Sequence, residues 1–267
     1  MTGVAEAGIA VVVLTHDRVH LLRQCVERVI AGLSDDTAEI VIWNNGSTDG
    51  TREFLDSLDD PRLRIVHNPT NVGQNGYARS VALTSSPYIV ELDDDVVDAP
   101  PGWDRRLRLA FEQLPRIGYL AADLEDDPHD VASHWRYRIR PHEYEPADVN
   151  GVSLLFGPTG GACAITSREL YERAGGFRER PGKIFWTEDA AYIGDIRRLG
   201  FEAAVLADLK VHHTGGEYYG VRNAEKDAFW AAHWRRKARR AAVKRVLVRV
   251  PFVRRLNARH GWFVEPS

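Results

Sequence analysis

The sequence turns from apolar to acidic at Tyr88-Ile89-Val90-Glu91-Leu92-Asp93-Asp94-Asp95, and this stretch decides the fold. Parallel sheets bind ligands outside the carboxyl ends of their strands, which is where the three aspartates would stand. Adjacent carboxylates raise one another's pKa unless a cation offsets their charge. Hard oxygen ligands suit Mg²⁺ or Mn²⁺, and these ions suit a diphosphate. Taken alone, the triplet is equally consistent with a solvated acidic turn.

Strands and helices alternate on the amino-terminal side of this stretch. The run Ile9-Ala10-Val11-Val12-Val13-Leu14 is typical of a strand buried on both faces of a parallel sheet. Apolar residues at spacings of three and four predict a helix over 19–33. Further strands are expected at 40–43, 63–66 and 88–92, and further helices at 54–58 and 77–84. This alternation predicts an α/β fold in which helices cover both faces of a mostly parallel sheet.

The pattern loosens after Pro100-Pro101. A strand is expected at 117–122, and residues 125–150 are expected to form a long loop of the kind that is usually functional or mobile. Beyond it, the patterns predict strands at 152–156, 163–166, 201–206 and 209–212 and helices at 167–174 and 188–199. We therefore expect one domain with two halves, 1–115 and 116–221, followed by a helical tail at 222–267.

The composition excludes several classes of protein. The 267 residues are 44% hydrophobic and 27% charged, as in ordinary soluble enzymes and unlike disordered or fibrous chains. Cys25 and Cys163 are too few for a disulfide framework, which favours a reducing compartment. The longest apolar run, at 9–14, is far shorter than the ~20 residues of a membrane span, and it has no features of a signal peptide. A cytoplasmic protein is expected.

The net charge of −3 hides a basic tail. Arg222–His260 holds 13 basic and 2 acidic residues, which leaves 22 basic and 36 acidic residues for the rest of the chain. Aromatic and basic residues on an amphipathic helix suit an anionic membrane surface, so the segment 224–259 is a candidate for peripheral contact with the inner face of a membrane. A helix docked on the acidic body fits equally well. Nucleic acid is not expected, because no recognition motif accompanies the charge.

Two further groups of residues could carry chemistry. Trp186-Thr187-Glu188-Asp189 opens a helix, where acidic residues otherwise complement the helix dipole. Val211-His212-His213-Thr214-Gly215-Gly216 ends a short strand. Because neighbouring strand residues face opposite ways, only one of the two histidines is expected to be a ligand. Each group taken alone is more often structural.

Taken in order along the chain, these segments resemble the family-2 glycosyltransferases of the GT-A fold. The resemblance covers about residues 9–216. The motifs that carry it are Val11-Val12-Val13-Leu14-Thr15, Asn45-Gly46-Ser47-Thr48-Asp49-Gly50-Thr51, Asn71-Val72-Gly73 with Ala78-Arg79, Leu92-Asp93-Asp94-Asp95, Gly160-Gly161-Ala162, Gly175-Gly176-Phe177, and Glu188-Asp189 with Arg197 and Gly200. The resemblance implies a three-layer αβα, Rossmann-like fold that binds a nucleotide-diphosphate sugar.

The resemblance also implies a role for each group of residues. The substrates, chiefly the donor, would be bound by Thr15, Asp17, Arg18, Asn44, Asn45, Gly73, Arg79, Asp93, Asp94, Gly160, Gly161 and Trp186. The metal, Mn²⁺ or Mg²⁺, would be held by Asp95 and Asp93 with either His212 or His213, of which His212 is favoured. Asp189 would be the catalytic base, and Glu188 would orient the acceptor.

The implied chemistry is direct displacement at the anomeric carbon of the sugar. The metal would offset the charge that develops on the departing diphosphate, while Asp189 takes the proton of the attacking hydroxyl. Attack assisted by one base inverts the anomeric centre, unlike the two-carboxylate retaining scheme of many hydrolases. The expected acceptor is a glycan, a glycolipid or a small molecule, in the synthesis of cell-surface polysaccharide or a glycoconjugate.

Departures from the family pattern leave the donor open. Asn44 stands where the family usually has an aspartate that accepts from uracil, and an amide both accepts and donates. UDP- or dTDP-sugars are favoured, and GDP-sugars also fit. The nearest rival is a sugar-phosphate nucleotidyltransferase, which should carry a glycine-rich loop after its first strand, whereas Thr15-His16-Asp17-Arg18 holds no glycine. A non-catalytic nucleotide-sugar-binding homologue would require Asp95 and Asp189 to face away from a common cleft.

Overall fold

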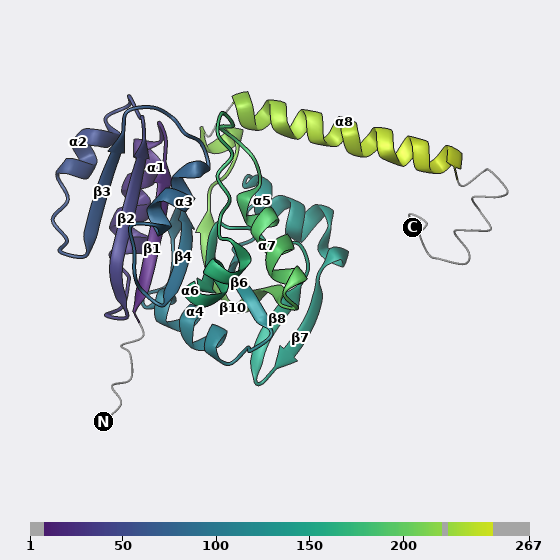
Figure 1. The fold of residues 1–267 in the computed structure, drawn as a ribbon, viewed down its shortest axis with the longest axis horizontal. Helices are drawn as coiled ribbons and strands as arrows, with labels where there is room; N and C mark the ends of the chain where they lie inside the picture. The colour runs from purple at the N-terminus through teal and green to yellow at the C-terminus, as the bar shows by residue number, and fades with distance from the viewer. Residues whose placement is uncertain (1–7, 221–223, 248–267) are drawn as a thin grey trace. The chain divides into compact units, whose positions relative to one another are not determined.

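A computed structural model describes residues 8–220 and 224–247 of the chain (Figure 1). The chain divides into two units, Met1–Val221 and Arg222–Ser267, and each is described by itself. The first unit is built on one ten-stranded sheet. Its strand order is β3-β2-β1-β4-β9-β6-β10-β8-β7, and β5 pairs with β10 beside this path.

Four parallel strands form the amino-terminal half of the sheet. They are β1 (Ile9–Thr15), β2 (Thr37–Asn45), β3 (Leu63–Asn68) and β4 (Tyr88–Asp93). β1 lies between β2 and β4, with Val13 opposite both Ile42 and Leu92. All three of these side chains are buried, as the continuous apolar runs predict. Because the four strands are parallel, their carboxyl ends meet at one edge of the sheet.

The second half of the sheet is mixed. It consists of β5 (Val96–Asp98), β6 (Ile117–Leu124), β7 (Glu145–Val149), β8 (Val152–Phe156), β9 (Cys163–Ser167) and β10 (Glu202–His213). β9 lies antiparallel between β4 and β6, whereas β6 and β10 are parallel. β8 and β7 complete the sheet as an antiparallel pair. The carboxyl end of β10 therefore lies at the same edge as the end of β4.

Helices cover both faces of this sheet. They are α1 (Val19–Gln24) with its π-helical continuation η1 (Cys25–Ile30), α2 (Thr51–Asp56), α3 (Asn75–Val81), α4 (Trp103–Glu112), α6 (Arg168–Ala174) and α7 (Glu188–Arg198). Val11 and Val13 of β1 belong to one apolar core with α1, η1, α2 and α4. Val12 points the other way, into a second core with α3, α6 and α7. The alternation of neighbouring strand residues thus produces the expected three-layer αβα arrangement.

Two expectations about the second half are wrong, and one helix, α4, was not predicted. Residues 125–150 are not one loop: they form α5 (Val131–His134), the π-helical η2 (Trp135–Ile139), the 3₁₀ turn η3 (Pro141–Glu143) and β7. Contacts with distant segments, such as the buried ion pair between Arg136 and Asp123, support these elements, and hydrophobic periodicity does not reveal such contacts. The unexpected α4 buries Trp103, Leu107 and Ala110, a helical spacing that the sequence does contain. The strands expected at 201–206 and 209–212 are one strand, β10, with a register shift between Leu206 and Lys210.

The second unit contains α8 (Ala224–Leu247). Aromatic rings stack along its first turns, where the centroids of Trp230 and Trp234 lie 6.4 Å apart. The part of the expected tail beyond residue 247 lies outside the described residues. Among residues 8–220 and 224–247, no helix is both long enough and apolar enough to cross a membrane.

Candidate metal and transfer site

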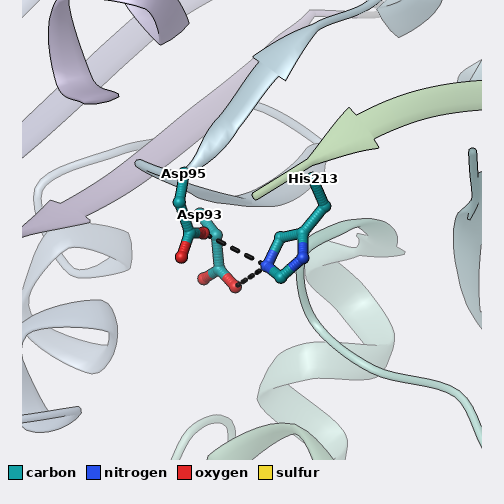
Figure 2. Close-up of side chains that lie close together, drawn as sticks. All are labelled: Asp93, Asp95 and His213. Atoms are coloured by element: carbon teal, nitrogen blue, oxygen red, sulfur yellow. Dashed lines mark ion pairs between the residues drawn. The ribbon is translucent and has the colours of Figure 1, made fainter. Parts of the chain in front are cut away.

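Asp93 at the end of β4, Asp95 in the turn that follows and His213 at the end of β10 meet at the carboxyl edge of the sheet (Figure 2). The Nε2 atom of His213 lies 3.2 Å from Oδ1 of Asp95 and 4.0 Å from Oδ2 of Asp93. Asp95 and His213 are buried, whereas the side chain of Asp93 is 36% exposed. Each residue offers one ligand atom, and these atoms lie within 4.8 Å of one another. Two carboxylate oxygens and one imidazole nitrogen form a donor set that fits Mn²⁺ or Mg²⁺.

A short strand that the sequence analysis missed brings these residues together. After the aspartates the chain turns into β5, which pairs antiparallel with the end of β10 and places His213 opposite Val96. The next residue, Thr214, donates its backbone N–H to the carbonyl oxygen of Asp95 at 2.8 Å. Backbone pairing therefore fixes the distance between the acidic turn and the histidine.

Asp130 fixes the orientation of the His213 ring. Its buried carboxylate caps α5 by accepting the N–H of Ser133 at 2.8 Å, and its Oδ1 lies 2.8 Å from Nδ1 of His213. Oδ1 also accepts the N–H of Gly215 at 3.0 Å. Burial lowers the pKa of His213, but Asp95 and Asp130 outweigh this effect and raise that pKa well above its usual value. With Nδ1 facing Asp130, Nε2 is directed at the two aspartates, as in the carboxylate–histidine pairs of metal sites.

Arg18 connects the first strand–helix loop to the acidic turn. Its guanidinium lies 2.8 Å from Oδ1 of Asp94 and 3.0 Å from Oδ2 of Asp95. Burial raises the pKa of Asp94 to about 6, although the charge of Arg18 acts in the opposite direction. Arg18 is thus engaged with the acidic residues themselves, and the predicted contact with the donor is not required to explain its position.

The two histidines of β10 have different surroundings, and the preference for His212 as the metal ligand is corrected. Nε2 of His212 lies 3.2 Å from Oδ2 of Asp127, and Nδ1 lies 4.0 Å from Glu125. His213 instead faces Asp93 and Asp95. Alternation along a strand predicts that the two rings diverge, but it does not say which of them faces the acidic turn.

The predicted base, Asp189, lies across a short glycine loop from the aspartates. Oδ2 of Asp189 accepts the N–H of Gly161 at 3.1 Å, and the carbonyl oxygen of Ala162 accepts the N–H of Asp93 at 2.8 Å. Burial raises the pKa of Asp189, and the charge of Asp93 raises it further. The glycine loop therefore contacts both Asp93, a member of the metal-type cluster (Asp93, Asp95 and His213), and Asp189 at the start of α7.

Glu91 forms the floor beneath this loop and was not predicted as a site residue. It is buried in β4 and accepts a hydrogen bond from the hydroxyl of Tyr119 at 2.7 Å. A Cβ atom on Gly161 would lie only 2.8 Å from its carboxylate, so glycine is required there. Burial and the charge of Asp189 raise the pKa of Glu91 well above its usual value. The only signal in the sequence is an acidic residue within an apolar strand.

Glu188 and Tyr77 complete the surroundings of the site. Glu188 is buried at the start of α7 and accepts a hydrogen bond from Nε2 of Gln74 at 3.1 Å. Its pKa is raised well above the usual value by burial and by Asp189. The hydroxyl of Tyr77 donates to Oδ1 of Asp93 at 2.6 Å. Neither Gln74 nor Tyr77 belongs to a motif that the sequence analysis identified.

At the end of β2, Asn44 is held by two contacts. Its Oδ1 accepts the N–H of Ser47 at 3.0 Å, and its Nδ2 lies 3.1 Å from Nδ1 of His67. Nε2 of His67 in turn lies 2.9 Å from Oδ1 of Asp56. These contacts fix the orientation of the Asn44 amide, in which Oδ1 has a second lone pair and Nδ2 a second N–H.

The other predicted donor-binding residues hold the loops at this edge. Asn45 accepts the N–H of Val72 at 2.8 Å and donates to the carbonyl oxygen of Gly73 at 3.2 Å. Gly73 has a left-handed φ of 59°, and a Cβ there would lie 1.8 Å from the carbonyl oxygen of Ile184. Close backbone approach therefore accounts for this glycine.

Asp17 links the loops after β1 and β2. It adopts a φ of 50°, a left-handed value that asparagine and aspartate tolerate better than most residues, and its Oδ1 accepts the N–H of Thr48 at 2.6 Å. Thr15 is buried at the end of β1. Arg79 forms an exposed ion pair with Glu179 at 2.9 Å.

The remaining predicted residues flank Asp189. Trp186 is buried, with the guanidinium of Arg180 6.0 Å from its ring. A Cβ on Gly160 would lie 3.7 Å from Oδ2 of Asp189, an ordinary contact distance. Gly160 is thus less constrained than its neighbour Gly161.

Comparisons with known proteins agree with this architecture. The family described as glycosyl transferase family 2 matches residues 10–175. The chain is 35% identical over 72 residues to the succinoglycan biosynthesis protein ExoA of Rhizobium meliloti, a match that covers 26% of this chain and 22% of that protein. It is 27% identical over 190 residues to the O-antigen biosynthesis protein RfbC of Myxococcus xanthus, a match that covers 64% of this chain and 15% of that protein. The matches thus span less than a quarter of these relatives.

Solved structures share the fold. The mannosyltransferase PcManGT from Pyrobaculum calidifontis, in complex with GDP-Man and Mn²⁺, has a TM-score of 0.55 and 21% identity, with 78% of this chain and 57% of that chain covered. Glucosyl-3-phosphoglycerate synthase from Mycobacterium tuberculosis, in complex with Mn²⁺, UDP and glucosyl-3-phosphoglycerate, has a TM-score of 0.51 and 20% identity, with 79% and 73% covered. Together with the match over residues 10–175, the architecture leads to one conclusion: the chain belongs to glycosyl transferase family 2 and has the GT-A fold.

Proposed function

We propose that the protein is an inverting glycosyltransferase that moves a sugar from a nucleotide-diphosphate donor to an acceptor hydroxyl. The observation that carries this proposal is the convergence of Asp93, Asp95 and His213 at the sheet edge, one glycine loop away from Asp189. The cluster and Asp189 supply the two requirements of inverting transfer, which are an anion-stabilising centre and a base.

Asp93, Asp95 and His213 would hold Mn²⁺ or Mg²⁺. The bound cation would offset the negative charge that develops on the departing diphosphate. Arg18 holds Asp95 from the side opposite His213, since it contacts Oδ2 while His213 contacts Oδ1. The donor set is therefore positioned before a ligand arrives, which reduces the cost of organising it during the reaction.

Asp189 would accept the proton of the acceptor hydroxyl. The N–H groups of Gly161 and Ala190 hold its carboxylate in place, at 3.1 and 2.6 Å. The raised pKa strengthens it as a proton acceptor. Glu188, the neighbouring carboxyl group, would orient the acceptor, and its hydrogen bond from Gln74 fixes its own position.

The nucleobase of the donor would be read near Asn44. The amide of Asn44 can both donate and accept, and uracil, thymine and guanine each carry a carbonyl oxygen and a ring N–H that would match it. We favour UDP- or dTDP-sugars, with GDP-sugars as the alternative; solved structures of the same fold contain GDP-Man in one case and UDP in another.

The acceptor would be a glycan, a glycolipid or a small molecule. The relatives ExoA and RfbC are named for succinoglycan and O-antigen biosynthesis, which supports a role in the synthesis of cell-surface polysaccharide. Helix α8 would bind an anionic membrane surface from the cytoplasmic side, since its mostly basic run 235–240 begins eight residues, or about two helical turns, after its last acidic residue, Asp227.

Thermal-shift measurements with nucleoside diphosphates test this proposal. UDP, dTDP or GDP should raise the melting temperature of the protein in the presence of Mn²⁺ and much less in its absence, because a ligand of the folded state stabilises it by mass action. Asp95→Ala should abolish the Mn²⁺-dependent part of the shift. If no nucleoside diphosphate shifts the melting temperature with Mn²⁺, the proposed function is wrong.

A further inference from the structure

An exposed apolar stripe runs along α5 and η2. Val131, Trp135 and Ile139 follow one another at intervals of four residues, and they are 51%, 40% and 48% exposed. Tyr218, which is 67% exposed, lies in the 3₁₀ turn η4 (Glu217–Tyr219). In the described part of the first unit, the other exposed large apolar residues are Leu109 and Leu199, which stand alone on α4 and after α7.

Contacts join Tyr218 to the stripe. Its ring stacks on His129, with centroids 3.8 Å apart, and His129 lies two residues before Val131. A Cβ on Gly216 would lie 2.5 Å from the side chain of Val131, so the η4 segment packs directly against α5. Tyr218 therefore lies near the start of the stripe, and we call these four side chains the α5–η4 patch (Val131, Trp135, Ile139 and Tyr218).

The inner face of the same helix is tied to the body. Arg136 is buried and forms an ion pair with Asp123 at the end of β6. Ser133 is also buried and donates to the carbonyl oxygen of Asp127 at 2.7 Å. These buried polar contacts hold the helix against the body of the first unit. The side chains of the patch are therefore exposed on an ordered helix.

The patch lies beside the proposed transfer site. Asp130, the residue before Val131, is the group that orients His213. Exposed apolar surfaces of this kind mark sites of contact with proteins or membranes. Tryptophan and tyrosine are the side chains that favour the boundary between lipid and water, because they are apolar with one polar end.

Charge favours lipid as the partner of this surface. In the sequence, α8 begins six residues after Tyr218, and it carries exposed Arg235, Arg236, Lys237, Arg239 and Arg240. Basic residues of this density attract anionic headgroups, while the aromatic and aliphatic side chains of the patch suit the layer just beneath them.

We propose that the α5–η4 patch inserts into an anionic lipid surface, so that the enzyme meets acceptors that are displayed on a membrane. The purpose assigned to this contact rests on the proposed transferase function, whereas the contact itself does not. α8 supplies the electrostatic attraction, and the patch supplies the apolar anchor close to the site.

Flotation with lipid vesicles tests the proposal. The full chain should bind vesicles of phosphatidylglycerol and phosphatidylcholine and bind vesicles of phosphatidylcholine alone much less. Replacing Trp135 and Ile139 together by serine should weaken vesicle binding by about tenfold or more, because two apolar side chains that would be buried in the lipid are lost. The matched control is Leu109→Ser with Leu199→Ser, which removes equally exposed apolar residues outside the patch and should leave binding unchanged.

A second variant covers the case in which Trp135→Ser fails to fold. Val131→Ser with Ile139→Ser changes only the two aliphatic members of the patch and should also reduce binding. For every variant, the Mn²⁺-dependent thermal shift with UDP or GDP should equal that of the wild type. Unchanged vesicle binding by the folded patch variants, or an equal loss in the Leu109 and Leu199 control, would overturn the proposal.

Other outcomes separate this proposal from the transferase function. A wild-type protein that binds nucleotide with Mn²⁺ but binds no vesicle refutes the membrane contact alone. One that binds vesicles but no nucleotide refutes the transferase function alone. A dimer in solution that the patch substitutions dissociate would show that a second copy covers the patch, and would likewise overturn the proposal.

Discussion

Asp189 combines the two properties that a base needs at this site, which are a fixed position and a raised pKa. Backbone N–H groups of Gly161 and Ala190 hold its two oxygens. Burial and the charge of Asp93 disfavour its ionised form. A positioned base contributes about 10²–10⁴-fold to the rate, which sets the size of the effects expected on its removal.

Asp189→Asn should reduce turnover by about 10²–10⁴-fold, because the amide cannot accept the acceptor proton. The affinity for the nucleotide in the presence of Mn²⁺ should stay the same, since Asp189 lies outside the Asp93, Asp95 and His213 cluster. Single-turnover rates and calorimetric titration measure the two effects separately. The exposed Asp126→Asn serves as a control. Wild-type turnover in Asp189→Asn would remove this residue from the role of base.

The pH dependence of turnover should reflect the raised pKa of Asp189. A base works only when it is deprotonated, so turnover should rise with pH as that group loses its proton. Because the pKa is raised, the acidic limb should lie above the ordinary aspartate value of about 3.9. A pH–rate profile at saturating metal and donor measures it. Full activity down to pH values near 4 would contradict this assignment.

Gly160 and Gly161 form a matched pair for testing the floor of the site. Gly161→Ala would place a Cβ 2.8 Å from the carboxylate of Glu91, which the hydroxyl of Tyr119 holds in place. Overpacking of this kind costs about 1–3 kcal/mol in the free energy of unfolding. Gly160→Ala meets its nearest atom at 3.7 Å and should cost much less. Urea unfolding compares the two, and equal losses would show that Glu91 does not confine the loop.

At the scale of elements, the start of α5 connects the segment 125–150 to the cluster of Asp93, Asp95 and His213. Its cap, Asp130, also orients His213, so the order of this segment and the geometry of the cluster depend on one carboxylate. Contacts with distant segments therefore stabilise helices in a segment that the sequence predicted to be a loop. β1 was predictable because its burial requires a continuous apolar run, whereas α5 depends on partners far away in the chain.

Asp130→Asn should weaken Mn²⁺ binding by about 10–100-fold, as loss of the partner of a metal-ligating histidine commonly does. Ser167→Ala is a matched control, since Ser167 caps α6 and its loss costs about 1 kcal/mol of stability without touching the cluster. Calorimetry with Mn²⁺ and thermal unfolding distinguish the two effects. If both variants retain wild-type Mn²⁺ affinity, the orienting role of Asp130 is wrong.

At the scale of the whole molecule, the sequence predicted the α/β sheet and the acidic turn, because both follow from local patterns. It could not predict which histidine joins Asp93 and Asp95, since that depends on the pairing of β5 with β10. Nor did it identify Glu91, Tyr77 or Asp130. Each of these residues acts through a hydrogen bond to a residue on another strand or helix, and such contacts leave no local pattern in the sequence.

Titration of Mn²⁺ in the presence of UDP or GDP, compared between His213→Ala and His212→Ala, tests the central claim most directly. His213 lies 3.2 Å from Asp95, whereas His212 contacts Asp127 on the other side of β10. His213→Ala should therefore lose most of its Mn²⁺ affinity, and His212→Ala should keep it. Equal affinities in the two variants, or a loss confined to His212→Ala, would contradict the metal site described above.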